Sequence, residues 1–141
     1  MGPRFWPVAS GIDDPDYGEF PLKAFLGLEI EDGEPGQAEA WLDVGDDHMN
    51  PNGVVHGGVV FTLADTAMGR ATMSILDEGQ FCASIEVSVR FLRAVPAGRL
   101  RARVQVLHAG RRIVHLDGRV FVDGEEKPVA AVSGSFAVLG G

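Results

Sequence analysis

Cysteine is almost absent from this 141-residue chain: Cys82 stands alone, so no internal disulfide framework can form and no cysteine cluster is available for a metal. The first residues lack the apolar core of a signal peptide and the Ser or Thr of a myristoylation signal. The longest apolar stretch contains Asp65 and Arg70, which argues against a membrane span. These absences predict a soluble cytoplasmic protein without a metal or a membrane partner.

Positive charge is also scarce, because 12 Lys and Arg face 20 Asp and Glu and the net charge is −8. This balance argues against nucleic acid as a partner. Residues 1–80 hold three cations and fifteen acids, whereas residues 81–141 hold nine cations, eight of them arginines, and five acids. Most of these arginines are expected to lie on solvated strand faces. Because arginine suits bidentate binding of phosphate, two or three of them are candidates for docking a small anionic ligand.

The hydrophobic pattern divides the chain into an arm and one domain. Residues 1–20 are rich in Pro, Gly and Asp, which predicts an irregular N-terminal arm anchored by Phe5, Trp6 and Tyr17. Residues 21–141 are expected to form a single domain.

Within that domain, residues 20–25 are compatible with a short helical turn, and residues 59–76 predict one long apolar helix that must be buried. Alternating apolar and polar residues predict six strands, with turns at glycines between them. The expected strands are residues 28–31, 38–44, 84–91, 99–106, 114–122 and 129–138. We therefore expect an α+β fold in which one antiparallel sheet curls around one helix.

The segment from residue 48 to residue 65 is the main functional clue. It begins as a polar loop with turn formers, continues through Gly57 and Gly58, and enters the apolar helix that carries Asp65. An unpaired carboxylate in apolar surroundings is costly, and burial should raise its pKa. A buried acid following a glycine-lined helix N-terminus predicts an active site.

Together with the strand order, the pattern Asn50…Gly53…His56-Gly57-Gly58…Asp65 resembles the hotdog-fold thioesterases, most of all the PaaI-like branch that hydrolyses acyl- or aryl-coenzyme A thioesters. The resemblance runs from about residue 25 to residue 138. It implies a homodimer whose sheets join side by side, with two active sites at the interface, and dimers that pair into a homotetramer. The His56 loop of one subunit would face Asp65 of the other. Coenzyme A is then part of the substrate, and no separate cofactor is expected.

Asp65 is the predicted catalyst, as a general base for water or as a nucleophile toward the thioester carbonyl. The amides of Gly57 and Gly58 lie where a helix leaves N–H groups unpaired, so they are predicted to polarise that carbonyl. The alternatives are that Asp65 is a buried acid with a structural role and that Gly57 and Gly58 only form a turn. The residues themselves do not decide between water attack and an anhydride intermediate, and we slightly favour the general base.

The resemblance adds further site residues. It implies that Asn50 lies near the acyl carbonyl and that Ser84 assists the water, whereas the plain alternatives are an Asx turn and an ordinary strand hydroxyl. His56 would orient the loop or contact the thioester.

The resemblance also places the coenzyme A phosphates near the end of the strand at residues 84–91 and the neighbouring loops. Arg93 is the first candidate for holding them, followed by Arg111 and Arg112. The acyl pocket is predicted to be lined by Phe61, Leu63 and Met68, which are otherwise plain core residues.

Two other functions fit parts of the pattern. A hydratase acting on enoyl thioesters would need an Asp and a His in a different motif at the start of the helix. A non-catalytic acyl-coenzyme A binding or regulatory protein could keep the glycines and arginines but would not need Asp65. The carboxylate therefore favours the thioesterase.

Overall fold

The computed structural model describes residues 9, 11–15 and 17–141, so the predicted anchors Phe5 and Trp6 lie outside the described residues. The described elements follow the predicted order of two strands, one long helix and four strands. They are α1 (Pro21–Leu26), β1 (Glu29–Asp32), β2 (Gln37–Asp43), the short 3-10 helix η1 (Asp46–His48), α2 (Gly57–Met73), β3 (Gln80–Phe91), β4 (Arg99–Ala109), β5 (Ile113–Val122) and β6 (Ala130–Gly140).

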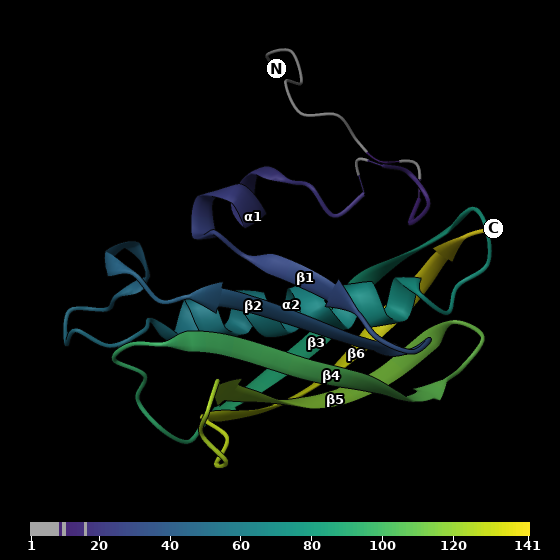
Figure 1. Cartoon of the computed structure of the whole chain (residues 1–141). Helices are drawn as coiled ribbons and strands as arrows, with labels where there is room; N and C mark the ends of the chain where they lie inside the picture. Colours follow the sequence, from purple (N-terminus) through teal and green to yellow (C-terminus); the bar gives the residue numbers. More distant parts are fainter. Residues whose placement is uncertain (1–8, 10, 16) are drawn as a thin grey trace.

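The six strands form one antiparallel sheet in the order β1-β2-β4-β5-β6-β3. β6 pairs with both β5 and β3, which leaves β3, the first strand after the helix, at one edge. Figure 1 shows the sheet curling around α2, with α1 beyond β1. This arrangement confirms the predicted α+β hotdog fold.

The core forms where the dry face of the sheet meets α2. On β4 and β5 alternate apolar residues are buried, as the pattern predicts, and they pack against the helix. The fully buried side chains include Leu42, Leu63, Leu100 and Leu116. In the described part of the chain, no helix combines the length and the apolar character that a membrane crossing needs.

α2 differs from the prediction in its bounds and in its burial. It begins at Gly57 and ends at Met73, so it starts two residues earlier and ends three earlier than expected, and Asp65 lies in its third turn. The expectation that this mostly apolar helix is buried does not hold for one stripe. Phe61 is 41% exposed, and Asp65 and Gly69 are only half-buried. Within one protomer the sheet therefore covers one side of α2 and leaves this stripe open.

β3 departs from strict alternation. The pairing with β6 shifts between Ser84 and Glu86, which makes Ile85 the extra residue of a β-bulge. Ile85 was predicted to share the dry face with Val87, but it is 55% exposed. Ser84 pairs with the buried Phe136, so its side chain points to the helix side of the sheet. The bulge thus turns Ser84 toward α2.

Candidate active site

Asp65 lies on the open stripe of α2, beside β3. Its Oδ1 atom is buried, and no described residue forms a hydrogen bond with it. Burial raises the pKa of Asp65 above its ordinary value, while the Ser84 hydroxyl opposes the shift by stabilising the charged carboxylate. The carboxylate is therefore more basic than a surface acid, as a general base requires.

The N-terminus of α2 carries two glycines at positions where a Cβ atom would be crowded by a neighbouring side chain. His56 is the N-cap residue, and its Nδ1 accepts a hydrogen bond of 2.8 Å from the Gly58 N–H. A Cβ on Gly58 would lie 3.0 Å from that nitrogen, and a Cβ on Gly57 would lie 3.0 Å from Cζ of Phe91. The Gly57 N–H lies in the first turn of α2, where a helix leaves N–H groups without an intrahelical partner.

The loop before the helix is organised by Asn50. Its Oδ1 accepts hydrogen bonds from the backbone N–H of Asn52 at 2.8 Å and of Val54 at 3.4 Å, which is the Asx-type turn that the sequence left open. Both bonds use the amide oxygen, so the Nδ2 group is left to donate elsewhere. The Val55 N–H then bonds to the Val95 carbonyl at 2.8 Å and fixes this loop beside the β3–β4 connection.

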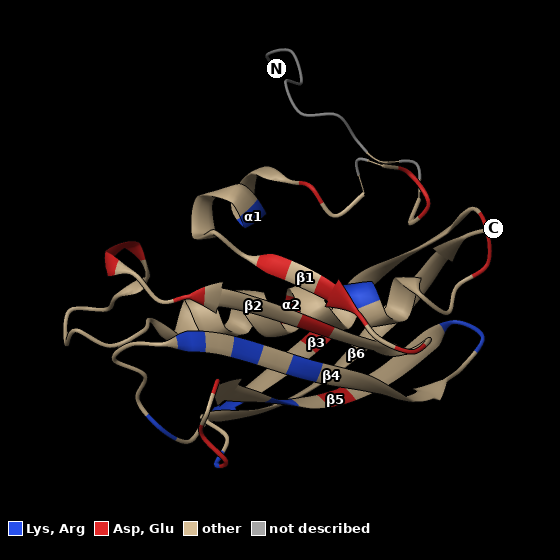
Figure 2. Ribbon diagram, viewed as in Figure 1, with Lys and Arg blue, Asp and Glu red and all other residues tan. Residues whose placement is uncertain are grey.

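The predicted phosphate ligands do not meet within one protomer. Arg93 lies in the β3–β4 connection, which contacts the loop before α2. Arg111 and Arg112 lie in the β4–β5 turn, at the other end of the eleven-residue strand β4. Figure 2 shows basic segments in these two connections at opposite ends of the sheet. Arg93 alone is at the same end as Gly57.

The three residues predicted to line an acyl pocket have different environments. Leu63 and Met68 are fully buried and belong to the core, where they pack between α2 and the sheet. Phe61 reaches the surface on the open stripe. Of the three, Phe61 is the one with an exposed side chain.

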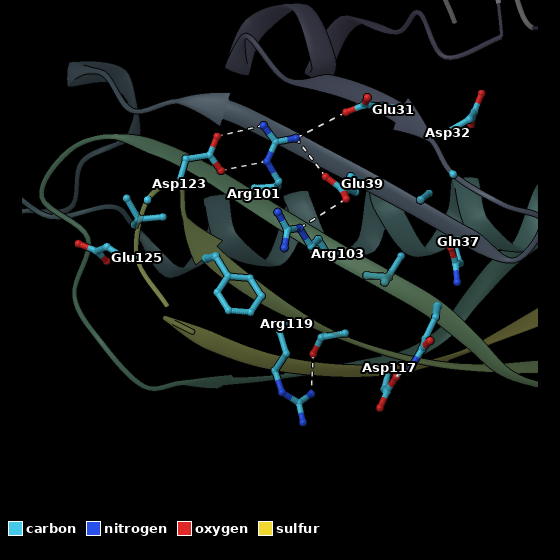
Figure 3. A pocket seen from close by; sticks show the side chains of 18 residues that line it. Glu31, Asp32, Gln37, Glu39, Arg101, Arg103, Asp117, Arg119, Asp123 and Glu125 are labelled. Carbon is cyan, nitrogen blue, oxygen red and sulfur yellow. Dashed lines mark hydrogen bonds and ion pairs between the residues drawn. The ribbon is translucent and has the colours of Figure 1, made fainter. Parts of the chain in front are cut away.

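A large hollow on the outer face of the sheet is not part of this site. It has a volume of about 1040 Å³ and is lined by charged residues of β1, β2, β4 and β5. Figure 3 shows Arg101 between Asp123, at 3.0 Å, and Glu39, at 3.1 Å. Arg103 also reaches Glu39, at 3.4 Å. Acids of the same chain neutralise these arginines. They therefore fit the interpretation that most arginines of the C-terminal half lie on solvated strand faces.

Sequence reasoning assigned no role to His48, which the structure places in the interior. His48 is 6% exposed; its Nδ1 accepts from the Gly45 N–H at 3.0 Å, and its Nε2 donates to the Leu26 carbonyl at 2.8 Å. It therefore ties α1 to the loop that leads into the site. The two buried hydrogen bonds of the His48 ring identify this role. The sequence around His48 contains no motif that predicts it.

Arg70 is a second residue that the sequence did not single out. From the C-terminal half of α2 it makes two hydrogen bonds to Asp32 on β1, at 2.7 and 2.8 Å. The guanidinium also lies 5.0 Å from the centroid of the Tyr17 ring, in cation–π geometry. Tyr17 thus contacts the body of the domain, as the predicted anchoring of the arm requires.

The chain matches the thioesterase superfamily over residues 52–129, a segment that holds the α2 N-terminus, Asp65 and Ser84. The chain belongs to this superfamily. A relative from Haemophilus influenzae is 35% identical over 88 residues, which are 62% of this chain and 64% of that protein. The matched region is therefore somewhat less than two thirds of that relative's length.

Two solved structures share the hotdog architecture of this superfamily member. The BH2602 protein from Bacillus halodurans, solved with CoA, is 32% identical, with a TM-score of 0.80 over 89% of this chain and 82% of that one. The PaaI protein of E. coli, from the phenylacetic acid degradation operon, is 30% identical, with a TM-score of 0.77 over 85% of each chain. The predicted PaaI-like hotdog family is confirmed.

Proposed function

We propose that the protein hydrolyses acyl- or aryl-coenzyme A thioesters to the free acid and coenzyme A. The observation that carries this proposal is the Asp65 carboxylate, desolvated and lacking a partner at Oδ1, on the open stripe of a thioesterase-superfamily helix. A hydratase motif is missing from the sequence, and a simple binding protein would not need this carboxylate.

In the proposed reaction Asp65 takes a proton from water as the water attacks the thioester carbonyl carbon, and the coenzyme A thiolate then leaves. Direct attack by the carboxylate, followed by hydrolysis of an anhydride, is the alternative route. The Gly57 N–H donates to the carbonyl oxygen as it gains negative charge, and the Gly58 N–H joins it when His56 releases its bond. Ser84 orients the carboxylate, and the Asn50 amide donates near the acyl carbonyl.

Helix geometry supports a site shared by two protomers. Gly57 and Asp65 are eight residues apart on one helix, which separates them by about 12 Å along its axis. A base and an oxyanion donor acting on one carbonyl must each lie about 3 Å from the reacting group, so one protomer does not supply both. A homodimer that brings Gly57 of one protomer beside Asp65 of its partner completes the site. Pairing of two such dimers into a homotetramer is the further arrangement that we propose.

Arg93 is the proposed contact for the coenzyme A phosphates, because it shares an end of the sheet with the α2 N-terminus. The CoA bound to the Bacillus halodurans neighbour makes this ligand class the natural one to test. Arg111 and Arg112 lie at the opposite end of the same protomer, so they contribute only if a partner places them beside the nucleotide.

The direct test is release of free thiol from acetyl-, butanoyl-, octanoyl- and benzoyl-coenzyme A by the wild type and by Asp65→Asn. We expect Asp65→Asn to lower kcat/KM by at least about 10²-fold, as for the loss of a positioned base. Asp47→Asn removes an exposed acid of η1 and serves as the matched control, with activity unchanged. Equal turnover by wild type and Asp65→Asn contradicts the assignment, and wild-type protein that binds these thioesters without cleaving them supports the binding-protein alternative.

A further inference from the structure

The described strands carry five arginines on the outer face of the sheet, namely Arg90, Arg99, Arg101, Arg103 and Arg119. The three on β4 each lie within 3.4 Å of a carboxylate oxygen. Among the residues that the structure describes, no acid forms an ion pair with Arg90 or Arg119. The Nη1 group of Arg119 donates only to the Gly118 carbonyl, at 2.7 Å, and Figure 3 shows this guanidinium pointing away from Arg101 and Arg103. Two of the five arginines are therefore available to an anion from outside the chain.

The register places these two arginines in one row across three strands. Arg119 of β5 and Arg90 of β3 are both Cα partners of Ala131 on β6. Neighbouring strands lie about 4.7–4.9 Å apart, so the two Cα atoms are roughly 10 Å apart, with only the Ala131 methyl group between them. Arg103 of β4 continues the row as the partner of Arg119, and Glu39 neutralises Arg103 alone. Because like charges in such a row destabilise a sheet, an anion between Arg119 and Arg90 would relieve their repulsion.

A hollow of about 390 Å³ lies between the two arginines. Ala131 and Ser133 line it from the central strand β6. Asp117 is the one acid among the described residues that line this hollow, so two guanidinium groups face one carboxylate. The hollow therefore keeps a net positive charge, with an exposed serine hydroxyl beside it.

We propose that this hollow binds a phosphate monoester, held between Arg90 and Arg119. A monoester carries about 1.5 to 2 negative charges at neutral pH, and the fork of each guanidinium matches a pair of its oxygens. The Ser133 hydroxyl can donate a further hydrogen bond. The volume lies within the range of about 300–1,000 Å³ that is common for small-molecule sites, which leaves room for the organic part of the ligand.

The site is separate from the proposed active site. Val132, between Ala131 and Ser133, points into the core with α2, so its two neighbours face the opposite side of the sheet from Asp65. Phosphate binding here does not depend on thioester hydrolysis.

The test is isothermal titration calorimetry of inorganic phosphate and of phenyl phosphate, at low salt, with the wild type, Arg90→Gln and Arg119→Gln. We expect each variant to raise Kd at least about 10-fold, as for the loss of a charge-assisted contact. Asp117→Asn removes the repelling acid and should lower Kd. Arg99→Gln is the matched control: Asp43 already binds this arginine of the same face, at 2.8 Å, so Kd should stay at the wild-type value.

Weaker binding by both variants of the unpaired arginines supports the site. Tighter wild-type binding of phenyl phosphate than of inorganic phosphate then identifies an organic monoester as the ligand, and equal binding identifies free phosphate. Wild-type affinity in both Arg90→Gln and Arg119→Gln places the phosphate elsewhere, such as at Arg93, and overturns the inference. An equal loss in Arg99→Gln, or no binding to the wild type at millimolar concentration, also overturns it. Arg90 and Arg119 are exposed, so both variants should keep the wild-type Tm.

Discussion

A buried carboxylate oxygen without a hydrogen-bond partner is uncommon, because nearly all buried polar atoms in folded proteins are paired. Asp65 is such a case, and the groups around it explain how its protonation is tuned. Burial favours the neutral acid, and the Ser84 hydroxyl favours the anion. Burial is the larger of the two effects, so the carboxylate is more basic than an exposed aspartate, which suits proton abstraction from water.

The pH dependence of activity tests this balance at Ser84. The acidic limb of the kcat/KM profile marks the pKa of the catalytic base in the free enzyme. Burial places this limb above the ordinary aspartate value of 3.8. Ser84→Ala removes a donor that stabilises the charged form, so the pKa rises and the limb moves to higher pH. Ser88→Ala, an exposed serine on the same strand, should leave the profile unchanged; a limb that stays in place or moves down in Ser84→Ala contradicts the assignment.

At the scale of elements, the N-terminus of α2 depends on an unusual cap. His56 accepts the Gly58 N–H through its ring nitrogen, where Ser, Thr, Asp or Asn is the common choice. His56→Ala should lower the free energy of unfolding by about 1 kcal/mol, measured by urea denaturation. His56→Asn offers an amide oxygen to the same donor, so it should recover most of that stability and most of the hydrolytic activity. Recovered stability without recovered activity would show that the imidazole itself contacts the thioester.

The element order, the turns and most of the buried faces follow from periodicity, because side chains on strands alternate and those on a helix repeat every 3.6 residues. The start of α2 was missed because a histidine cap is not a sequence signal, although it places Gly57 and Gly58 inside the helix. The bulge at Ile85 was missed because an inserted residue keeps the local alternation while it shifts the register. Asp65 could be identified from the sequence motif. That Ser84 faces Asp65 could not be predicted, because it depends on the pairing register of β3 with β6.

At the scale of the whole molecule, the proposed dimer takes the α2 N-terminus of each protomer for one active site and its Asp65 for the other. The sheet ends at β3, whose outer side pairs with no strand of the described chain. The exposed residues on this strand include Phe81, Ile85 and Phe91, and Phe61 is exposed on α2. Exposed apolar edge strands invite pairing with another chain. Periodicity does not reveal which edge stays free, since that depends on the long-range pairing of β6 with β3.

If protomers pair through the β3 edge, a substitution that disrupts this edge should abolish both the dimer and the hydrolytic activity. Ile85→Asp places a charge where two β3 edges would meet, so we expect the dimer to dissociate and kcat/KM to fall by at least about 10²-fold, as when one half of a catalytic pair is lost. Light scattering coupled to size-exclusion chromatography measures the mass of the variant, and thiol release measures its activity. Leu107→Asp is the matched control, because Leu107 is 60% exposed on β4, away from this edge. An Ile85→Asp variant that is monomeric and fully active would mean that one chain contains the complete site. The axial separation of about 12 Å between Gly57 and Asp65 would then have to be bridged within that chain.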